Sequence, residues 1–167
     1  MLRLFDGAVL VHLLQPKGQK TFQDYAANIF CPYLQQQLQS VTRIDVIWDR
    51  YIPNSLKQGT RELRGQGIGS TRRRVLADTP IPVNWEGFLR LDANKEELFA
   101  FLAMCIQAMD TGEKIIISTW DDSVVSTNEV DLDGLQPCCH EKAEFYSMQH
   151  TEFYSMQHTV HRREQVR

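Results

Sequence analysis

The amino-acid sequence predicts an α/β fold, in which helices pack against a central, mostly parallel sheet. Apolar runs of strand length alternate along the chain with segments of helical spacing, an order that is typical of such folds. The chain has 167 residues, of which 43% are hydrophobic, enough to form one core. Charged residues make up 23%, the usual share of a globular protein, so bulk disorder is not expected.

The N-terminal part of the chain predicts a strand, a helical region and a second strand. Residues 2–6 form a short apolar run that is typical of a strand, whereas residues 7–16 are too densely apolar to distinguish a buried helix from a strand. Apolar side chains at mostly helical spacing predict a helix over residues 21–40, which Pro32 must kink or restart. Residues 43–49 are apolar without alternation, which predicts a strand covered on both faces.

The middle of the chain predicts two further helices and a basic loop. Residues 54–64 are polar and predict a helix, and three nearby glycines predict a flexible loop that carries the arginines 72–74. The clearest helix covers residues 92–110, where Asn94 is the expected cap and Glu97 returns the bond. The expected apolar face of this helix comprises Leu98, Phe101, Leu102, Cys105, Ile106 and Met109.

A β-hairpin is expected next, over residues 113–129, because β-branched runs lie on either side of Asp121 and Asp122. No linker interrupts the pattern, so we expect residues 1–143 to form one domain. The remaining segment, residues 144–167, differs in kind.

The octapeptide EFYSMQHT occupies residues 144–151 and is repeated without change at 152–159. An eight-residue period drifts across a helix face, because two helical turns take about 7.2 residues. Solenoids need longer units and several copies. We therefore predict a weakly ordered tail, with an extra helix docked on the core as the alternative.

Charge is distributed unevenly, although the formal net charge is only −3. Residues 57–74 contain six basic side chains and one acid, whereas residues 110–144 contain nine acids and two lysines. A basic arm and an acidic segment on one fold could contact a phosphodiester and a metal ion, respectively. The alternative is two solvated surfaces of opposite sign.

The cysteines and the apolar runs bear on the cellular location. Two of the four cysteines are adjacent in the sequence and two lie in apolar surroundings, so the chain lacks the pattern of a secreted disulfide framework. No signal peptide opens it, and no apolar run approaches the length of a membrane span. We expect an intracellular protein, nuclear or cytoplasmic, without a membrane partner.

Two acids, Asp6 and Asp49, each follow a predicted strand. Ligands of open α/β sheets bind at the carboxyl ends of the strands, so these acids could converge on one point. Facing carboxylates repel unless a cation lies between them, and Mg²⁺ is a usual solution. The alternative is that each aspartate merely caps the helix that follows it.

A basic set, Lys57, Arg61 and Arg64, follows Asp49 at spacings of four and three, which place it on one helix face. These side chains could neutralise phosphates, or the face could simply be solvated. The CCH run at residues 138–140 invites a zinc interpretation, but adjacent cysteines lack the usual ligand spacing and no zinc is expected.

Several of these motifs resemble a known family. LFDGAVLVHLL, VIWDRYIPNSLKQGTRELRG and PCCHEKAE occur in the order of motifs in PIN-like and flap-endonuclease-like nucleases. Residues 1–143 resemble more closely a group of animal proteins of mobile-element origin, which also have segments similar to IPVNWEGFLRLDANKEELFAFL.

The resemblance implies a metal-dependent nuclease that uses Mg²⁺ or Mn²⁺ on a nucleic-acid substrate. It implies that the principal metal ligands are Asp6 and Asp49, and that Glu144, with its neighbour Glu141, supplies further carboxylates. It also implies that the scissile phosphate is held by Lys57 and by Arg61 or Arg64.

The sequence departs from the family pattern near its C-terminus. The third motif should be Glu-Ala-Asp or Glu-Ala-Glu, but Lys142 stands where a carboxylate is expected. A fourth motif, Asp-Thr-Asp at the end of another strand, is absent, and the repeat begins where the family helix should continue. We therefore expect a domain truncated or frame-shifted at its C-terminus, with an exposed sheet edge and impaired activity. The alternative is a catalytically inactive module that binds nucleic acid or protein.

Overall fold

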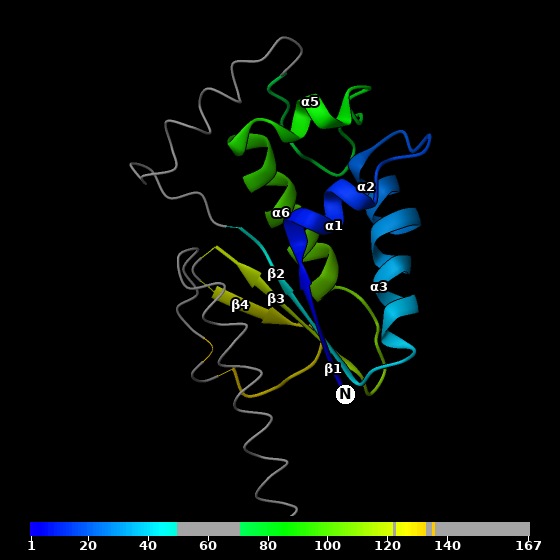
Figure 1. Ribbon diagram of the computed structural model, residues 1–167, viewed down its shortest axis with the longest axis vertical. Coiled ribbons are helices and arrows are strands. Elements are labelled where there is room, and N and C mark those ends of the chain that lie inside the picture. Colours follow the sequence, from blue (N-terminus) through cyan, green and yellow to red (C-terminus); the bar gives the residue numbers. More distant parts are fainter. Residues whose placement is uncertain (50–70, 122, 133–134, 136–167) are drawn as a thin grey trace, which may run out of the picture.

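The computed structural model describes residues 1–49, 71–121, 123–132 and 135, and these residues form an α/β structure (Figure 1). Its sheet has four strands in the order β1-β2-β3-β4. The strands span Leu2–Asp6 (β1), Arg43–Ile47 (β2), Ile115–Trp120 (β3) and Ser123–Ser126 (β4). The helices span Gly7–Leu13 (α1), Phe22–Tyr25 (α2), Ala26–Phe30 (η1), Cys31–Leu38 (α3), Trp85–Leu89 (α5) and Asp92–Gln107 (α6).

The first three strands are parallel and the fourth is antiparallel to its neighbour, which confirms the predicted mostly parallel sheet. In the register of β1 and β2, Asp6 lies opposite Ile47, so the two strands end side by side. The hairpin of β3 and β4 turns at Asp121, whose φ of 52° lies in the left-handed region that tight hairpins require. The strand predicted over residues 2–6 and the hairpin are thereby confirmed, and the strand predicted over residues 43–49 is confirmed for Arg43–Ile47.

The two faces of the sheet have different contents. Because side chains alternate, Ile44, Val46 and Ile116 share one face, and all three are fully buried in the core. The helices α3 and α6 pack on this face, α3 toward β1 and β2 and α6 toward β3 and β4 (Figure 1). The opposite face carries an ion pair between the partly buried Arg43 and the buried Asp45, in which Arg43 Nε and Nη2 donate to the two carboxylate oxygens at 2.6 and 2.8 Å.

Residues 7–13 form helix α1. The segment whose sequence is compatible with either a buried helix or a strand is therefore a helix. The predicted helix over 21–40 begins with a capping box, in which Thr21 and Asp24 exchange hydrogen bonds. It then widens into the π-helix η1 and restarts as α3 with Pro32 in its first turn. Proline has no N–H to continue the α-helical ladder, so the predicted interruption at Pro32 is confirmed and takes the form of a change of hydrogen-bond register.

The helix predicted over residues 92–110 is confirmed as α6, but its expected cap is wrong. The cap position is Leu91, and Asn94 lies inside the first turn with a fully buried side chain. Its Nδ2 donates to the carbonyls of Thr71 and Phe88, both at 2.9 Å. Asn94 therefore holds together segments that are distant in sequence instead of capping its own helix. The preceding short helix α5 was not among the predicted elements.

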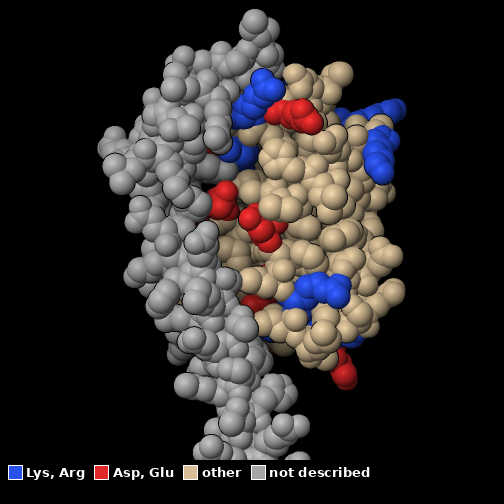
Figure 2. Space-filling view, in the orientation of Figure 1, with Lys and Arg blue, Asp and Glu red and all other residues tan. Residues whose placement is uncertain are grey.

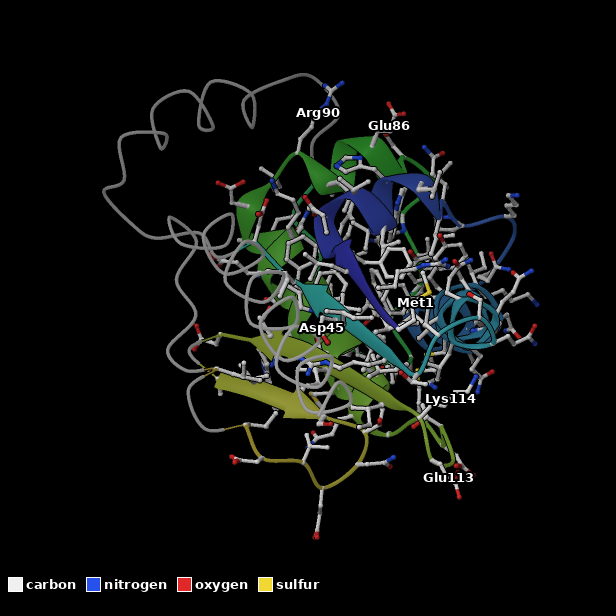
Figure 3. All side chains as sticks on the ribbon, turned by 60° about the horizontal axis from the view of Figure 1, so that its bottom comes forward. Met1, Asp45, Glu86, Arg90, Glu113 and Lys114 are labelled. Atoms are coloured by element: carbon white, nitrogen blue, oxygen red, sulfur yellow. The ribbon has the colours of Figure 1, made fainter. Side chains whose placement is uncertain are left out.

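Figure 3 shows the sheet from another side, with Met1, Glu113 and Lys114 near the amino ends of the strands. Glu86 and Arg90, on and just after α5, lie toward the opposite end. Acidic and basic side chains of the described residues lie interspersed on the face seen in Figure 2. No helix of the described segments is both long and apolar enough to cross a membrane. Residues 144–167, the predicted tail, lie outside the described residues.

Candidate functional site at the carboxyl ends of the strands

The structure places Asp6 and Asp49 at the same edge of the sheet. Asp6 is the last residue of β1, and Asp49 follows the last residue of the parallel neighbour β2 by two positions. Asp6 is exposed, and Asp49 is partly buried. The predicted convergence of the two acids on one end of the sheet is therefore present in the backbone arrangement.

Asp6 also performs the structural role that the sequence left open. Its Oδ1 accepts a hydrogen bond of 3.1 Å from the backbone N–H of Val9 and so caps helix α1. A carboxylate at a helix N-terminus satisfies one of the free N–H groups and interacts favourably with the helix dipole. Capping occupies one oxygen of this exposed side chain, so it leaves room for a second role.

The residue before Asp49 is anchored from three directions. The backbone N–H of Trp48 lies beyond the paired part of β2 and donates to Thr119 Oγ1 at 2.8 Å. Its indole Nε1 donates to Ser118 Oγ at 2.9 Å, and its ring stacks on Phe99 with centroids 4.7 Å apart. Ser118 and Thr119 are buried hydroxyl residues of β3. Their contacts fix the direction in which the chain leaves β2.

Sequence reasoning did not identify Ser118, Thr119 or Gly7 as residues of this region. The only available signal was chemical, namely two hydroxyl side chains that end the apolar run IIIST. Gly7 follows Asp6 directly and lies against the Trp48 ring, where a Cβ would be 2.6 Å from Cδ2 and Cζ3. No property of the isolated sequence could pair Gly7 with a tryptophan 41 positions later.

The end of β3 adds a third acid to this edge of the sheet. Asp121 follows Trp120, the last residue of the strand, and its side chain is exposed. Its left-handed backbone conformation is explained by the hairpin turn, because aspartate tolerates this region better than most residues. Its presence near the strand ends is therefore accounted for by the fold alone.

The remaining predicted site residues lie outside the described part of the chain. This holds for the expected phosphate-binding side chains Lys57, Arg61 and Arg64, and for the expected carboxylates Glu141 and Glu144. The CCH run at residues 138–140 is outside it as well. Within residues 1–49, 71–121 and 123–132, no group of three or more His, Cys, Asp or Glu side chains is placed to hold a metal ion.

The two strand-end aspartates nevertheless fit what Mg²⁺ or Mn²⁺ requires from a protein. Such an ion takes hard oxygen ligands and commonly uses one or two carboxylates, with water and substrate phosphate completing its coordination. Asp6 and Asp49 offer oxygen ligands from neighbouring strands, and neither is deeply buried. The described residues can therefore supply two carboxylate ligands for such an ion.

The arginines 72–74 belong to a segment that forms hydrogen bonds and an ion pair with the rest of the protein. Arg72 Nη1 donates to Asn94 Oδ1 at 3.0 Å, and its Nη2 forms an ion pair with Glu97. The backbone N–H of Arg73 donates to the same Asn94 oxygen, and Arg73 Nη1 donates to the carbonyl of Pro80. Two of the three arginines thus hold this segment against α6, and Arg74 is exposed.

No family model matches the chain, and comparisons with curated proteins and with solved structures found no match.

Proposed function

We propose that this chain contains a PIN-like, flap-endonuclease-like nuclease domain whose phosphodiester-hydrolysing activity is impaired. The observation that carries the proposal is the parallel register of β1 and β2, which brings Asp6 and Asp49 to one end of the sheet. This is where an α/β sheet binds its ligands, and hard cations prefer carboxylate oxygens. The resemblance of the surrounding motifs supports the same proposal.

In the proposed site, Asp6 and Asp49 hold the metal ion, with Glu141 and Glu144 as further ligands. When bound, Mg²⁺ or Mn²⁺ lowers the pKa of water and stabilises the oxygens of an in-line displacement at phosphorus. Lys57 and either Arg61 or Arg64 orient the phosphate through charge-assisted hydrogen bonds.

The anchored Trp48 fixes the backbone from which Asp49 extends, which gives the proposed ligand a defined position at the end of β2. Impairment is proposed because Lys142 stands where the resemblance expects a carboxylate.

A nuclease assay with Mn²⁺ tests the proposal through Asp49→Asn. This change keeps the size of the side chain but removes its charge, so we expect any cleavage to disappear while the chain remains folded. Glu113→Gln is the matched control, because Glu113 is exposed and precedes β3 at the other end of the sheet (Figure 3). Cleavage that survives Asp49→Asn and a chelator equally would refute the catalytic proposal.

The second candidate is a nucleic-acid-binding module without catalysis. The Asp6–Val9 hydrogen bond favours it, because capping explains Asp6 without any metal ion. Such a module predicts salt-sensitive binding that persists in a chelator and weakens when Arg61, Arg64 and Arg74 are neutralised.

Arg72 and Arg73 are poor choices for this test, because their bonds to Asn94 and Pro80 make their loss a structural change. Binding that is indifferent to salt and to these three neutralisations would refute the second candidate.

A further inference from the structure

The turn that carries Asp6 and the strand end that carries Asp49 touch each other through their neighbouring residues. Gly7 comes directly after Asp6, and Trp48 comes directly before Asp49. Gly7 is buried, and the position of a Cβ on it would overlap Cε3 of the Trp48 ring. The backbone of α1 therefore rests on the indole with no space between them.

The indole cannot move aside to accommodate a larger residue. Phe99 from α6 and Phe30 from η1 stack on it, with centroids 4.7 and 5.8 Å away. Its Nε1 is held by Ser118 Oγ, and the backbone N–H of the same residue is held by Thr119 Oγ1. A ring fixed by stacking and by two hydrogen bonds resists displacement, because protein interiors are close-packed.

This contact limits how far the backbones next to the two aspartates can shift relative to each other. The bond geometry of the chain places Asp6 one residue from Gly7 and Asp49 one residue from Trp48, so a shift of either partner moves an aspartate. From this geometry we infer that Gly7 and Trp48 are positioning residues, which set the separation of Asp6 and Asp49 for the binding of a divalent cation. The inference rests on the metal site proposed above, and it assigns a role to two residues that touch neither metal nor substrate.

The test measures binding of Mn²⁺ alone to the full chain, through the electron paramagnetic resonance signal of free Mn²⁺ during a titration. Gly7→Ala pushes the start of α1 away from the ring, and we expect Mn²⁺ affinity to fall by about 10-fold or more, as it does when residues behind metal ligands are changed. Trp48→Leu should relieve the overlap, so adding Gly7→Ala to Trp48→Leu should change the affinity much less than Gly7→Ala does alone.

Gly112→Ala is the matched control for a general loss of stability. Gly112 has a φ of +59°, so alanine there is strained, but a Cβ would meet no atom within 4 Å. It precedes β3 and thus lies at the end of the sheet opposite Asp49. We expect Gly112→Ala to lower the melting temperature and leave Mn²⁺ affinity unchanged.

Ser118→Ala provides a milder change in case Gly7→Ala does not fold. It frees the indole Nε1 without altering the packing volume, and we expect an intermediate, roughly threefold loss of Mn²⁺ affinity. Unchanged affinity in folded Gly7→Ala, or in Ser118→Ala where the glycine variant is unfolded, overturns the positioning role alone. A parent chain that binds no Mn²⁺ overturns the proposed metal site and the positioning role with it.

Discussion

Two buried polar networks of this molecule, one around Asn94 and one around Trp48, differ in what they hold in place. The Asn94 amide holds neighbouring segments together, since it forms hydrogen bonds with Thr71, Phe88, Arg72 and Arg73. Around Trp48, the hydrogen bonds also hold segments together, but the chain continues from them directly to a partly buried carboxylate, Asp49. The Asn94 network joins the segment 71–75 to α6 and leads to no candidate site residue. The Trp48 network fixes the backbone next to Asp49, a residue of the candidate site.

Asn94 therefore has a purely structural role, whereas Trp48 also supports a residue of the candidate site. Buried polar groups are costly unless they are paired, so each network must have a reason to exist. Asn94 is explained completely by the segment 71–75, which it fastens to α6 together with Glu97. Trp48 is explained by packing only in part, because its backbone hydrogen bond to Thr119 fixes the direction of the following residue.

The largest expected effect comes from Trp48→Ala. Removal of a buried indole that stacks on Phe99 and Phe30 leaves a cavity and takes away the donor to Ser118 Oγ, so we expect the unfolding free energy to fall by about 4 kcal/mol. Urea denaturation followed by circular dichroism measures this loss. Trp120→Ala is the control at a partly buried site, and it should cost less. Equal losses would show that Trp48 has no special position in the core.

Asn94→Ala should rank second. It removes the Nδ2 donor to the carbonyls of Phe88 and Thr71 and the acceptor of the Arg73 N–H, and the expected loss is about 3 kcal/mol. Asn94→Asp separates the two halves of the network, because aspartate still accepts from the Arg73 N–H but cannot donate. The aspartate variant should therefore retain part of the stability in the same urea experiment. If aspartate is no better than alanine, the bonds from Arg72 and Arg73 contribute nothing measurable.

The element order and the strand ends could be predicted from sequence because both depend on local patterns. The runs at residues 2–6 and 43–49 carry their own burial signal, and each ends near an acid. The α/β class followed from their alternation with helical spacing. A parallel register then needs no further information to place Asp6 and Asp49 at one edge.

The long-range contacts could not be predicted in the same way. Asn94 has the sequence context of a cap, with Glu97 three residues later, but tertiary partners in the segment 71–75 take both side chains instead. The pairing of Gly7 with Trp48 depends on the distance between β1 and β2, which no local pattern encodes. Local propensity fails at these positions because tertiary packing contributes more energy than a single cap does.

A third prediction separates the two roles of Asp6. Asp6→Ser keeps an oxygen that can accept from the Val9 N–H, so stability should be almost unchanged, whereas Asp6→Ala should cost about 1 kcal/mol. Both variants remove the carboxylate, and under the proposed function both should weaken Mn²⁺ binding to the same extent. Melting curves and Mn²⁺ titrations of the pair measure these effects. A serine variant that binds Mn²⁺ like the parent would assign Asp6 to capping alone.

A fourth prediction concerns the thiols of Cys31 and Cys105, which lie at the edge of the core. Burial, together with the nearby Cys105, raises the pKa of the Cys31 thiol to about 12. Burial also raises the pKa of the Cys105 thiol. The thiolate is the reactive form, so both thiols should react slowly with an alkylating reagent at neutral pH and quickly after unfolding. Mass spectrometry of timed alkylation measures the difference. Equal rates in the folded and the urea-unfolded chain would contradict the burial of both side chains.

The smallest expected effect is the pH dependence of the stability that Glu97 contributes next to Asn94. Burial alone would raise the pKa of Glu97, but hydrogen bonds from Arg72 and from the Val75 N–H, with the charges of Arg72 and Arg74, hold it below its ordinary value of 4.5. A carboxyl with a lowered pKa stabilises the folded state above its unfolded pKa, and this contribution is lost as the pH falls through the folded value. The stability difference between the parent and Glu97→Gln should therefore shrink from about pH 6 to about pH 3. Because the side chain is 35% exposed, solvent screening keeps the difference small. A difference that stays constant over this range would show that Glu97 acts through hydrogen bonding, which glutamine retains in part, and not through its charge.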